Sequence, residues 1–299
     1  MAEIVVCAAL YESGRKYFGD FVSGFLTACR HHDAEAVFAI DDLRDTKITV
    51  APVAEEMPVR FVGVAPGTSI AGVRRAMLEA VRETSSRYVV FSDMDDWLTP
   101  DAITRHKSAL ERGSFSYGDQ YIVDARGRFS GICLYDDWNV PQKITGMDAL
   151  MKWNFVGFGA AAIRRSCLTA DLCRIPETVK APDWWFFSMA LNAGCNGVRT
   201  DGPVANYRQH EGSFLGANSQ IGLPVLITRC NFAIKHFKAL PQCKQIQNRL
   251  ASIVDLKEIL QRAPQRLEPY YDYLSSRRFA WFEEITWLAD VVMNNVTKE

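Results

Sequence analysis

The sequence predicts an α/β protein built on an open, mixed but mostly parallel sheet with helices on both faces. Apolar, β-branched runs of strand length alternate with segments whose apolar residues recur every three or four positions. Acidic residues directly follow two of the runs, and open parallel sheets bind ligands at the carboxyl ends of their strands. From about residue 223 longer helical patterns predict a C-terminal helical extension.

The first 112 residues carry the clearest alternation of strands and helices. Strands are expected at residues 3–10, 35–42, 59–65 and 87–93. Helices are expected at residues 14–32, 68–84 and 99–110. The second helix is expected to be capped by Thr68 or Ser69. Its buried face is expected to consist of Ile70, Val73, Met77 and Val81. For the third helix, Thr99 is the expected N-cap and Pro100 the first helical residue.

Residues 113–222 mix short strand-like and helix-like pieces and end in an expected loop, "NYRQHEGSFLGANS". We place a boundary at 222, so that residues 1–222 form one domain in two halves, 1–112 and 113–222. Residues 223–299 form the extension, with two to four helices broken by prolines 241, 264 and 269.

Composition limits the class of protein. The chain has 299 residues, 48% of them hydrophobic, and a net charge of -1, which leaves no basic field for nucleic acid. No apolar run reaches the roughly 18–20 residues of a spanning helix, and Glu3 stands where a signal peptide needs base. Eight cysteines without a C-x-x-C pair predict reduced thiols and a cytoplasmic protein.

The segment "RYVVFSDMDDWLTPDAI" places Asp93, Asp95 and Asp96 at the end of a strand. Three close carboxylates repel one another, so the cluster predicts a bound cation such as Mg²⁺. A solvated turn in which Asp96 caps the next helix is the alternative. A calcium-binding EF-hand is excluded because Leu98 and Thr104 occupy its glycine and glutamate positions.

Four segments together resemble one family. "VFSDMDDWLTPDAI" is similar to the D-x-D segment of family-2-type, nucleotide-sugar-dependent glycosyltransferases with the GT-A fold. "EAVFAIDD" resembles their nucleobase-binding strand, "PGTSIAGVRRAMLEA" the helix before the D-x-D strand, and "NYRQHEGSFLG" a loop of the bacterial members. The resemblance covers residues 3–216 and implies a donor-binding half (1–112) and an acceptor half (113–222).

The resemblance implies roles for residues at matching positions. Asp41 would bind the donor base, and Asp93 would lie near the ribose or share the metal ion. Asp95 would bind the metal on the donor diphosphate, with His210 as a second ligand or a diphosphate contact. Two arginines are further donor-binding candidates. These are Arg74, which matches the helix arginine, and Arg208, which could neutralise phosphate. An ordinary loop histidine at 210 and a surface charge at 208 are the alternatives.

The segment "KAPDWWFFSMAL" resembles the family's acidic pair at the start of a helix, with Pro182 in place of the usual glutamate. The remaining Asp183 would be the general base of an inverting enzyme. Deprotonation of a sugar hydroxyl by a positioned carboxylate is worth on the order of 10²–10⁴-fold, and single displacement needs no covalent nucleophile. The alternative is that Asp183 only caps the helix.

We therefore expect a cytoplasmic, metal-dependent, inverting hexosyltransferase-like enzyme that uses Mn²⁺ or Mg²⁺ and a nucleoside-diphosphate sugar. Its acceptor would be a glycan, a lipid-linked intermediate or a protein, in bacterial glycan or polysaccharide synthesis. A nucleotidyltransferase is the rival enzyme, although "ALYESGRKYFG" lacks the glycine density of such a loop. A non-catalytic glycan-binding protein on the same fold is the rival outside enzymology.

Three further features have open interpretations. The rings of Trp138, Trp153, Trp184 and Trp185 either face a sugar or pack in the core, and packing is the default. "LYDDWN" (134–139) is a candidate acceptor loop or a solvated turn. The amphipathic residues 275–288 fit a lid, a homodimer interface or a peripheral helix at the inner membrane face.

Overall fold

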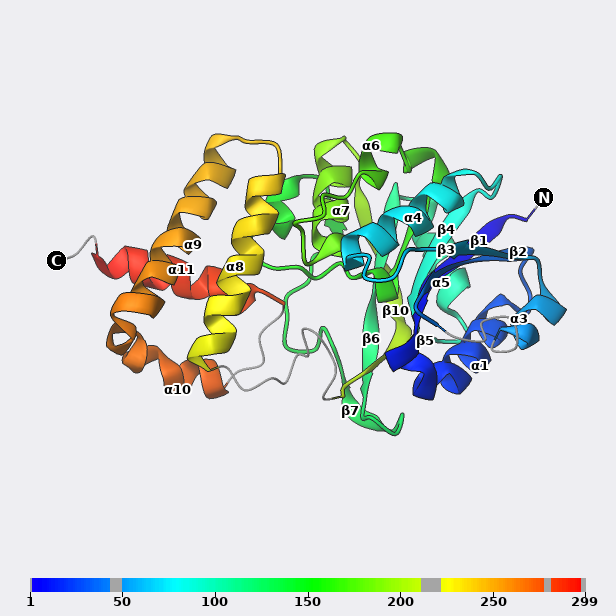
Figure 1. Cartoon of the computed structure of the whole chain (residues 1–299), viewed down its shortest axis with the longest axis horizontal. Helices are drawn as coiled ribbons and strands as arrows, with labels where there is room; N and C mark the ends of the chain where they lie inside the picture. Colours follow the sequence, from blue (N-terminus) through cyan, green and yellow to red (C-terminus); the bar gives the residue numbers. More distant parts are fainter. Residues whose placement is uncertain (1, 44–49, 211–221, 277–280, 297–299) are drawn as a thin grey trace.

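A computed structural model of the chain describes residues 2–43, 50–210, 222–276 and 281–296. The expected loop from 211 onward and residues 277–280 of the amphipathic segment lie outside the described residues. Within them, one mixed sheet of ten strands carries helices on both faces, and further helices form a group at one end (Figure 1). The predicted fold class is confirmed.

One half of the sheet is parallel. Its strands are β1 (Ile4–Tyr11), β2 (Ala34–Asp41), β3 (Val59–Gly63) and β4 (Tyr88–Asp93). They lie in the order β3-β2-β1-β4, and each neighbouring pair is parallel. All four strands were expected within two residues of these bounds. Because their carboxyl ends share one edge, Asp41 and Asp93 end their strands on the same side of the sheet.

The other half of the sheet is mixed. Its strands are β5 (Trp97–Leu98), β6 (Phe115–Val123), β7 (Phe129–Cys133), β8 (Lys143–Ile144), β9 (Ala161–Arg164) and β10 (Gly197–Arg208). Strand β9 runs antiparallel between β4 and β6, and so joins the two halves. Strand β10 is parallel to β6 and antiparallel to the short β5.

Strand β10 was not expected from the sequence, and its last three residues were assigned to the loop. The pattern is interrupted by Gly202, which has a φ of 97°, and by Pro203, which has no amide hydrogen. The pairing with β6 shifts register on both sides of Pro203. This bulge breaks the alternation of buried and exposed side chains that would identify a strand.

Two layers of helices cover the sheet. The described helices of the first 192 residues are α1 (Phe18–Cys29), α3 (Ala51–Glu56), α4 (Ile70–Arg82), α5 (Ala102–Leu110), α6 (Ala170–Cys173) and α7 (Pro182–Asn192). Helices α1, α3 and α5 pack on one face, and α4, α6 and α7 on the other. Strand β1 is buried on both faces, since Val5 and Cys7 join one core while Ile4 and Val6 join the other.

The helix starts were predicted with mixed success. The Oγ of Ser69 accepts a hydrogen bond from the Gly72 amide (3.0 Å), which confirms Ser69 as a cap. Ile70 was wrongly placed on the buried face, because its side chain is 45% exposed in the first turn. Helix α5 begins at Ala102 rather than Pro100, and Asp101 rather than Thr99 is at its N-cap position. The Thr99 amide and hydroxyl donate instead to the carbonyls of Val204 (3.0 Å) and Pro203 (3.3 Å) on β10.

Two expected helices are altered or replaced, and one short helix is additional. The helix expected at 14–32 divides into the 3₁₀ helix η1 (Glu12–Tyr17) and α1. A single 3₁₀ turn, η2 (Met147–Leu150), replaces the helix-like segment "TGMDALMKW". The short helix α3 was not expected.

The C-terminal helices share a core with the rest of the chain. They are α8 (Leu223–Ala239), α9 (Lys244–Arg262), α10 (Glu268–Ser276) and α11 (Glu283–Val296), with a 3₁₀ turn η5 (Pro264–Leu267) before α10. Nε1 of Trp185 on α7 donates to the Ala239 carbonyl (3.1 Å), and Phe237 packs against Trp184. Within the described residues no helix is long and apolar enough to cross a membrane.

A buried ion pair ties α8 to α11. Nη1 of Arg229 donates to Oε1 of Glu284 at 2.7 Å, and both side chains are buried. Removing one partner of a buried pair leaves an uncompensated charge in the interior.

Replacing Arg229 with methionine is therefore expected to lower the free energy of unfolding by about 3–5 kcal/mol. Glu284→Gln leaves the Arg229 charge without a counter-ion but keeps an oxygen that accepts from Nη1, so its loss should be clearly smaller. Urea unfolding followed by circular dichroism measures both. Equal losses for the two variants would contradict the conclusion that the hydrogen-bonded contact between Arg229 and Glu284 stabilises the packing of α8 on α11.

Candidate functional site

A cavity of about 460 Å³ lies at the carboxyl ends of the parallel strands. Five of the seven predicted site residues line it, namely Asp41, Arg74, Asp93, Asp95 and Asp183. The remaining two, Arg208 and His210, lie at the end of β10 and just after it. Both contact the acidic turn, which is the turn that carries Asp93, Asp95 and Asp96: Arg208 bonds to the Asp95 carbonyl and His210 to the Asp95 carboxylate. The strand ends and the start of α7 therefore bring together residues that are far apart in the sequence.

Asp93 is held between an arginine and a glycine. Arg74 on α4 forms an ion pair with Oδ1 of Asp93, and its guanidinium lies 5.2 Å from the centre of the Phe158 ring. A Cβ added at Gly159 would lie 2.9 Å from Oδ2 of Asp93 and 3.3 Å from Oδ2 of Asp96. The acidic turn thus packs against bare backbone, and a larger residue at 159 would displace it.

Asp95 faces His210 across the site. Oδ2 of Asp95 lies 3.1 Å from Nε2 of His210, and the Tyr11 side chain also forms a hydrogen bond with this carboxyl. Burial opposes ionisation of Asp95, but the hydrogen bonds from His210 and Tyr11 outweigh it and lower its pKa. A carboxylate kept ionised beside an imidazole is a donor set that fits a divalent ion such as Mn²⁺.

Asp96 has a different environment from its two neighbours. Its side chain is buried, and Oδ1 accepts a hydrogen bond from the Arg208 amide (2.8 Å). Burial, with the charges of Asp95 and Asp93, raises its pKa well above the usual range. Asp96 does not cap α5, as the alternative interpretation held, but links the acidic turn to β10.

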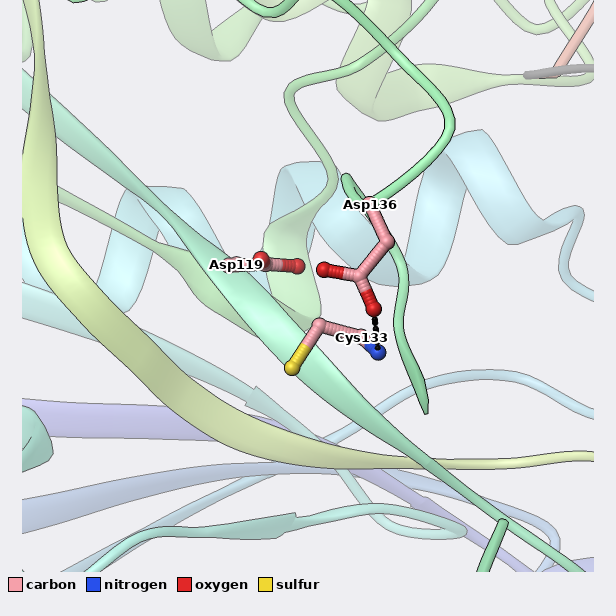
Figure 2. A group of neighbouring side chains, drawn as sticks. All are labelled: Asp119, Cys133 and Asp136. Atoms are coloured by element: carbon pink, nitrogen blue, oxygen red, sulfur yellow. Dashed lines mark hydrogen bonds between the residues drawn. The ribbon is translucent and has the colours of Figure 1, made fainter. Parts of the chain in front are cut away.

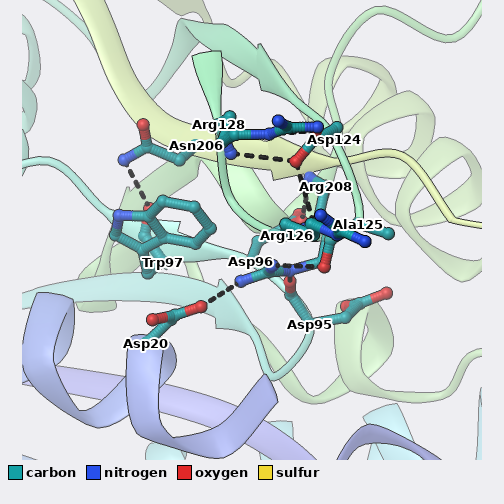
Figure 3. Close-up of polar contacts among 10 residues, drawn as sticks. All are labelled: Asp20, Asp95, Asp96, Trp97, Asp124, Ala125, Arg126, Arg128, Asn206 and Arg208. Atoms are coloured by element: carbon teal, nitrogen blue, oxygen red, sulfur yellow. Dashed lines mark hydrogen bonds and ion pairs between the residues drawn. The ribbon is translucent and has the colours of Figure 1, made fainter. Parts of the chain in front are cut away.

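Arg208 is an interior residue (Figure 3). Its Nε donates to the Asp95 carbonyl and its Nη1 to the Ala125 carbonyl, both at 3.0 Å. Nη2 pairs with Oδ2 of Asp20 on α1 at 2.5 Å, and the side chain is only 2% exposed. The interpretation as a surface charge is wrong. The expected diphosphate contact also gains no support, because this guanidinium is already engaged inside the fold.

Asp183 occupies the second position of α7, after Pro182. Oδ1 accepts from the Trp184 amide (2.9 Å), and Oδ2 accepts from Nδ2 of Asn154 (3.1 Å). Burial raises the pKa of Asp183 to about 6, which the charge of Asp93 reinforces and these hydrogen bonds oppose. The proline in place of the usual acid leaves the helix start intact.

Asp41 ends β2 at the far side of the cavity. Burial and the neighbouring charge of Asp42 raise its pKa. Asp42 itself has a φ of 56°, in the left-handed region where aspartate is among the more tolerant residues. The chain therefore turns directly after Asp41, which leaves that carboxyl at the cavity wall.

Several cavity residues were missed by sequence reasoning. Lys180, two residues before Pro182 in the same segment as Asp183, adds a positive charge to the main cavity. A second cavity, of about 160 Å³, adjoins the first and shares Asp93, Phe158 and Asp183 with it. Its other walls include Asn154 and Trp281, which meet only through the tertiary fold.

The tryptophans singled out from the sequence pack mainly in the core. Trp138, Trp184 and Trp185 are buried, and Trp153 is partly buried against Trp138 and Phe155. Core packing, the default interpretation, therefore accounts for them. The tryptophan that lines a cavity beside Asp183 is Trp281, to which no sugar-facing role was assigned.

A second acidic cluster joins β6, the end of β7 and the turn after it (Figure 2). Ligand atoms of Asp119, Cys133 and Asp136 come within 4.8 Å of one another. However, Asp136 accepts from the Cys133 amide (2.6 Å), while Asp119 accepts from the amides of Gln120 and Tyr135. These carboxylates order the turn that contains the expected acceptor loop, so we assign no metal to them.

Comparisons with known proteins agree on the fold. No protein-family profile and no curated protein sequence matches the chain. Among solved structures, S. aureus TarS 1–349 in complex with UDP-GlcNAc superposes with a TM-score of 0.58 at 12% identity, over 90% of this chain and 78% of that one. The mannosyltransferase PcManGT from Pyrobaculum calidifontis, in complex with GDP-Man and Mn²⁺, gives 0.57 at 16% identity, over 97% and 86%. The chain therefore has the GT-A-type fold of glycosyltransferases.

The interior position of Arg208 has a measurable consequence. Lysine keeps the charge but cannot make all of its bonds to Asp95, Ala125 and Asp20 at once. Arg208→Lys is expected to lower the free energy of unfolding by about 2–3 kcal/mol. The exposed Arg126→Lys should change it by less than about 0.5 kcal/mol. Unchanged unfolding with weakened nucleotide binding would instead support a diphosphate contact.

Proposed function

We propose that the protein is a metal-dependent, inverting glycosyltransferase that moves a hexosyl group from a nucleoside-diphosphate sugar to an acceptor hydroxyl. The observation that carries this proposal is that Asp41, Asp93, Asp95 and Asp183 line one cavity at the strand ends of a glycosyltransferase fold. Its volume of about 460 Å³ lies in the range of small-molecule sites. We further propose that it acts in bacterial glycan or polysaccharide synthesis.

The donor would lie along the main cavity. Asp41 would accept hydrogen bonds from the base, and Asp93 would lie near the ribose with Arg74 as its counter-charge. Lys180 would offset negative charge on the diphosphate. Asp95 and His210 would hold Mn²⁺ or Mg²⁺, which when bound stabilises charge developing on the leaving diphosphate. The fold neighbours bound to UDP-GlcNAc, and to GDP-Man with Mn²⁺, support this class of donor.

Asp183 would act at the junction of the two cavities. Its carboxylate would take the proton of the acceptor hydroxyl while that oxygen attacks the anomeric carbon and the bond to the diphosphate oxygen breaks. Inversion follows from this single displacement. A carboxyl with a pKa near 6 is both ionised at neutral pH and a stronger base than an ordinary aspartate.

The rival functions gain no support from the site. A nucleotidyltransferase would need an open, glycine-rich loop after β1. A Cβ at Gly14 would meet the Tyr11 ring at 2.7 Å, so the backbone packs closely there. A protein that only binds glycans would not need a carboxyl with a raised pKa between two cavities, such as that of Asp183. A cytoplasmic location stays our proposal, in line with eight cysteines that form no disulfide in the described structure.

Asp95→Ala is expected to abolish Mn²⁺-dependent donor binding, because it removes the central metal ligand. A thermal-shift screen of nucleoside diphosphates, UDP-GlcNAc and GDP-Man with Mn²⁺ measures this. Ligand at 100 times its Kd adds about 2.7 kcal/mol of stability to the wild type. Asp136→Ala, in the second acidic cluster, should keep the shift. If no nucleotide sugar is bound or cleaved with any divalent ion, the proposed function is wrong.

Asp183→Asn is expected to spare donor binding and remove transfer. Below about pH 6 the wild-type carboxyl is protonated and cannot accept a proton, so kcat/KM should fall as pH decreases through that value. The variant keeps one acceptor oxygen and loses a charge that burial opposes, so its melting curve is the control for correct folding. Wild-type-like transfer by the variant, or a flat wild-type profile between pH 5 and 8, would rule out this base.

A further inference from the structure

We propose that the second cavity is the acceptor subsite, that it takes a single sugar ring, and that the C-terminal extension supplies Trp281 as its aromatic wall. The inference rests on the proposed function and narrows the acceptor to a saccharide. The cavity is lined by Asp96, Gln120, Asn154, Asp183, Tyr207 and Trp281, among others. Its volume of about 160 Å³ equals roughly five molecules of liquid water, the scale of one sugar ring.

Asn154 supplies a polar anchor in this cavity. It is 2% exposed, and its Nδ2 donates to the Asp183 carboxyl, so the amide is fixed in orientation. Its Oδ1 has no hydrogen-bond partner among the described residues. A buried acceptor without a partner costs about 1–3 kcal/mol. A substrate hydroxyl bonded to this oxygen would remove that cost and would lie next to the hydroxyl that faces Asp183.

Trp281 supplies the apolar side. Its ring is partly exposed and stands at 79° to the Tyr207 ring (5.6 Å between centres) and at 62° to Trp138 (6.2 Å). These edge contacts hold the indole without covering it fully. A sugar ring has an apolar C–H face and hydroxyl edges, so an aromatic wall beside amide and carboxylate groups matches its chemistry.

The backbone at Trp281 is held in place at some energetic cost. The backbone N–H of Asn154 donates to the Trp281 carbonyl (3.0 Å), and the two residues form an isolated β-bridge. The next residue, Phe282, has a φ of 65°, which is a genuine outlier for a bulky side chain. Its ring is 1% exposed and stacks on Trp184 at 4.7 Å. Strain of about 1–3 kcal/mol held by surrounding contacts is typical of functional sites.

The same elements connect the wall to the base. Trp281 pairs with Asn154, Asn154 donates to Asp183, and Phe282 stacks on the residue that follows Asp183. The extension therefore reaches the reaction centre through two short routes, one polar and one aromatic. If the extension served only to complete the core, neither the unpartnered buried oxygen of Asn154 nor the partly exposed indole of Trp281 would be needed at this cavity.

The test uses the full chain with Mn²⁺ and the nucleotide sugar that binds best in the thermal-shift screen. Acceptor probes are a panel of methyl hexopyranosides and their disaccharides, and serine- and threonine-containing peptides. Trp281→Ala is expected to raise the KM for the best saccharide at least tenfold with kcat much less affected, while the donor Kd is unchanged. Trp281→Phe should be intermediate. Trp287→Ala, from α11 but packed on Tyr273, should leave the acceptor KM unchanged.

Other outcomes overturn the inference. Equal acceptor KM values for Trp281→Ala and Trp287→Ala would remove Trp281 from the subsite. Transfer to peptides but not to any saccharide would replace the acceptor class. Donor hydrolysis that no saccharide accelerates would overturn the acceptor assignment while leaving the proposed function in place. Absence of both donor binding and hydrolysis would refute the proposed function and the subsite with it.

Discussion

The candidate site depends on one buried arginine. Arg208 joins the carbonyl of Asp95, the hairpin at Ala125 and Asp20 on α1, while its own amide bonds to Asp96. Three carboxylates on one turn repel each other, and this cation, fixed behind the turn, offsets part of that repulsion. It also fixes the end of β10 against the turn that follows β4, which is why His210 lies beside Asp95.

Environment gives chemically identical side chains different roles. Asp95 is kept ionised by hydrogen bonds and suits a cation, whereas Asp96 is buried against a backbone amide and holds the turn together. Asp183 lies between these extremes, half-enclosed and with its pKa raised to about 6, which suits the role of proton acceptor that we propose for it. Residue type alone would not have separated the three, since each difference comes from burial and from the groups that donate to the carboxyl.

Sequence reasoning predicted the features of the fold and the site that depend on local residue patterns. The parallel strands, and hence Asp41, Asp93 and Asp95 at their ends, follow from apolar runs ended by acids. Asp183 was identified only through the resemblance of its segment to the acidic pair of the glycosyltransferase family. Non-local features were missed. Strand β10 is interrupted by Gly202 and Pro203, and the interior role of Arg208 depends on partners from three distant segments. Trp281 reaches the cavity through contacts between distant segments, which no short motif encodes.

The shared core of α7 and the extension limits how this protein could be recombined. Trp184, which directly follows Asp183, stacks on His236 of α8 and on Phe282. A chimera joined at residue 222 would therefore replace the residues that stack on Trp184. A shift of Trp184 would in turn displace Asp183, which precedes it in the chain. Because α7 and the extension share one core, the segment from α7 to α11 would have to be exchanged as a whole.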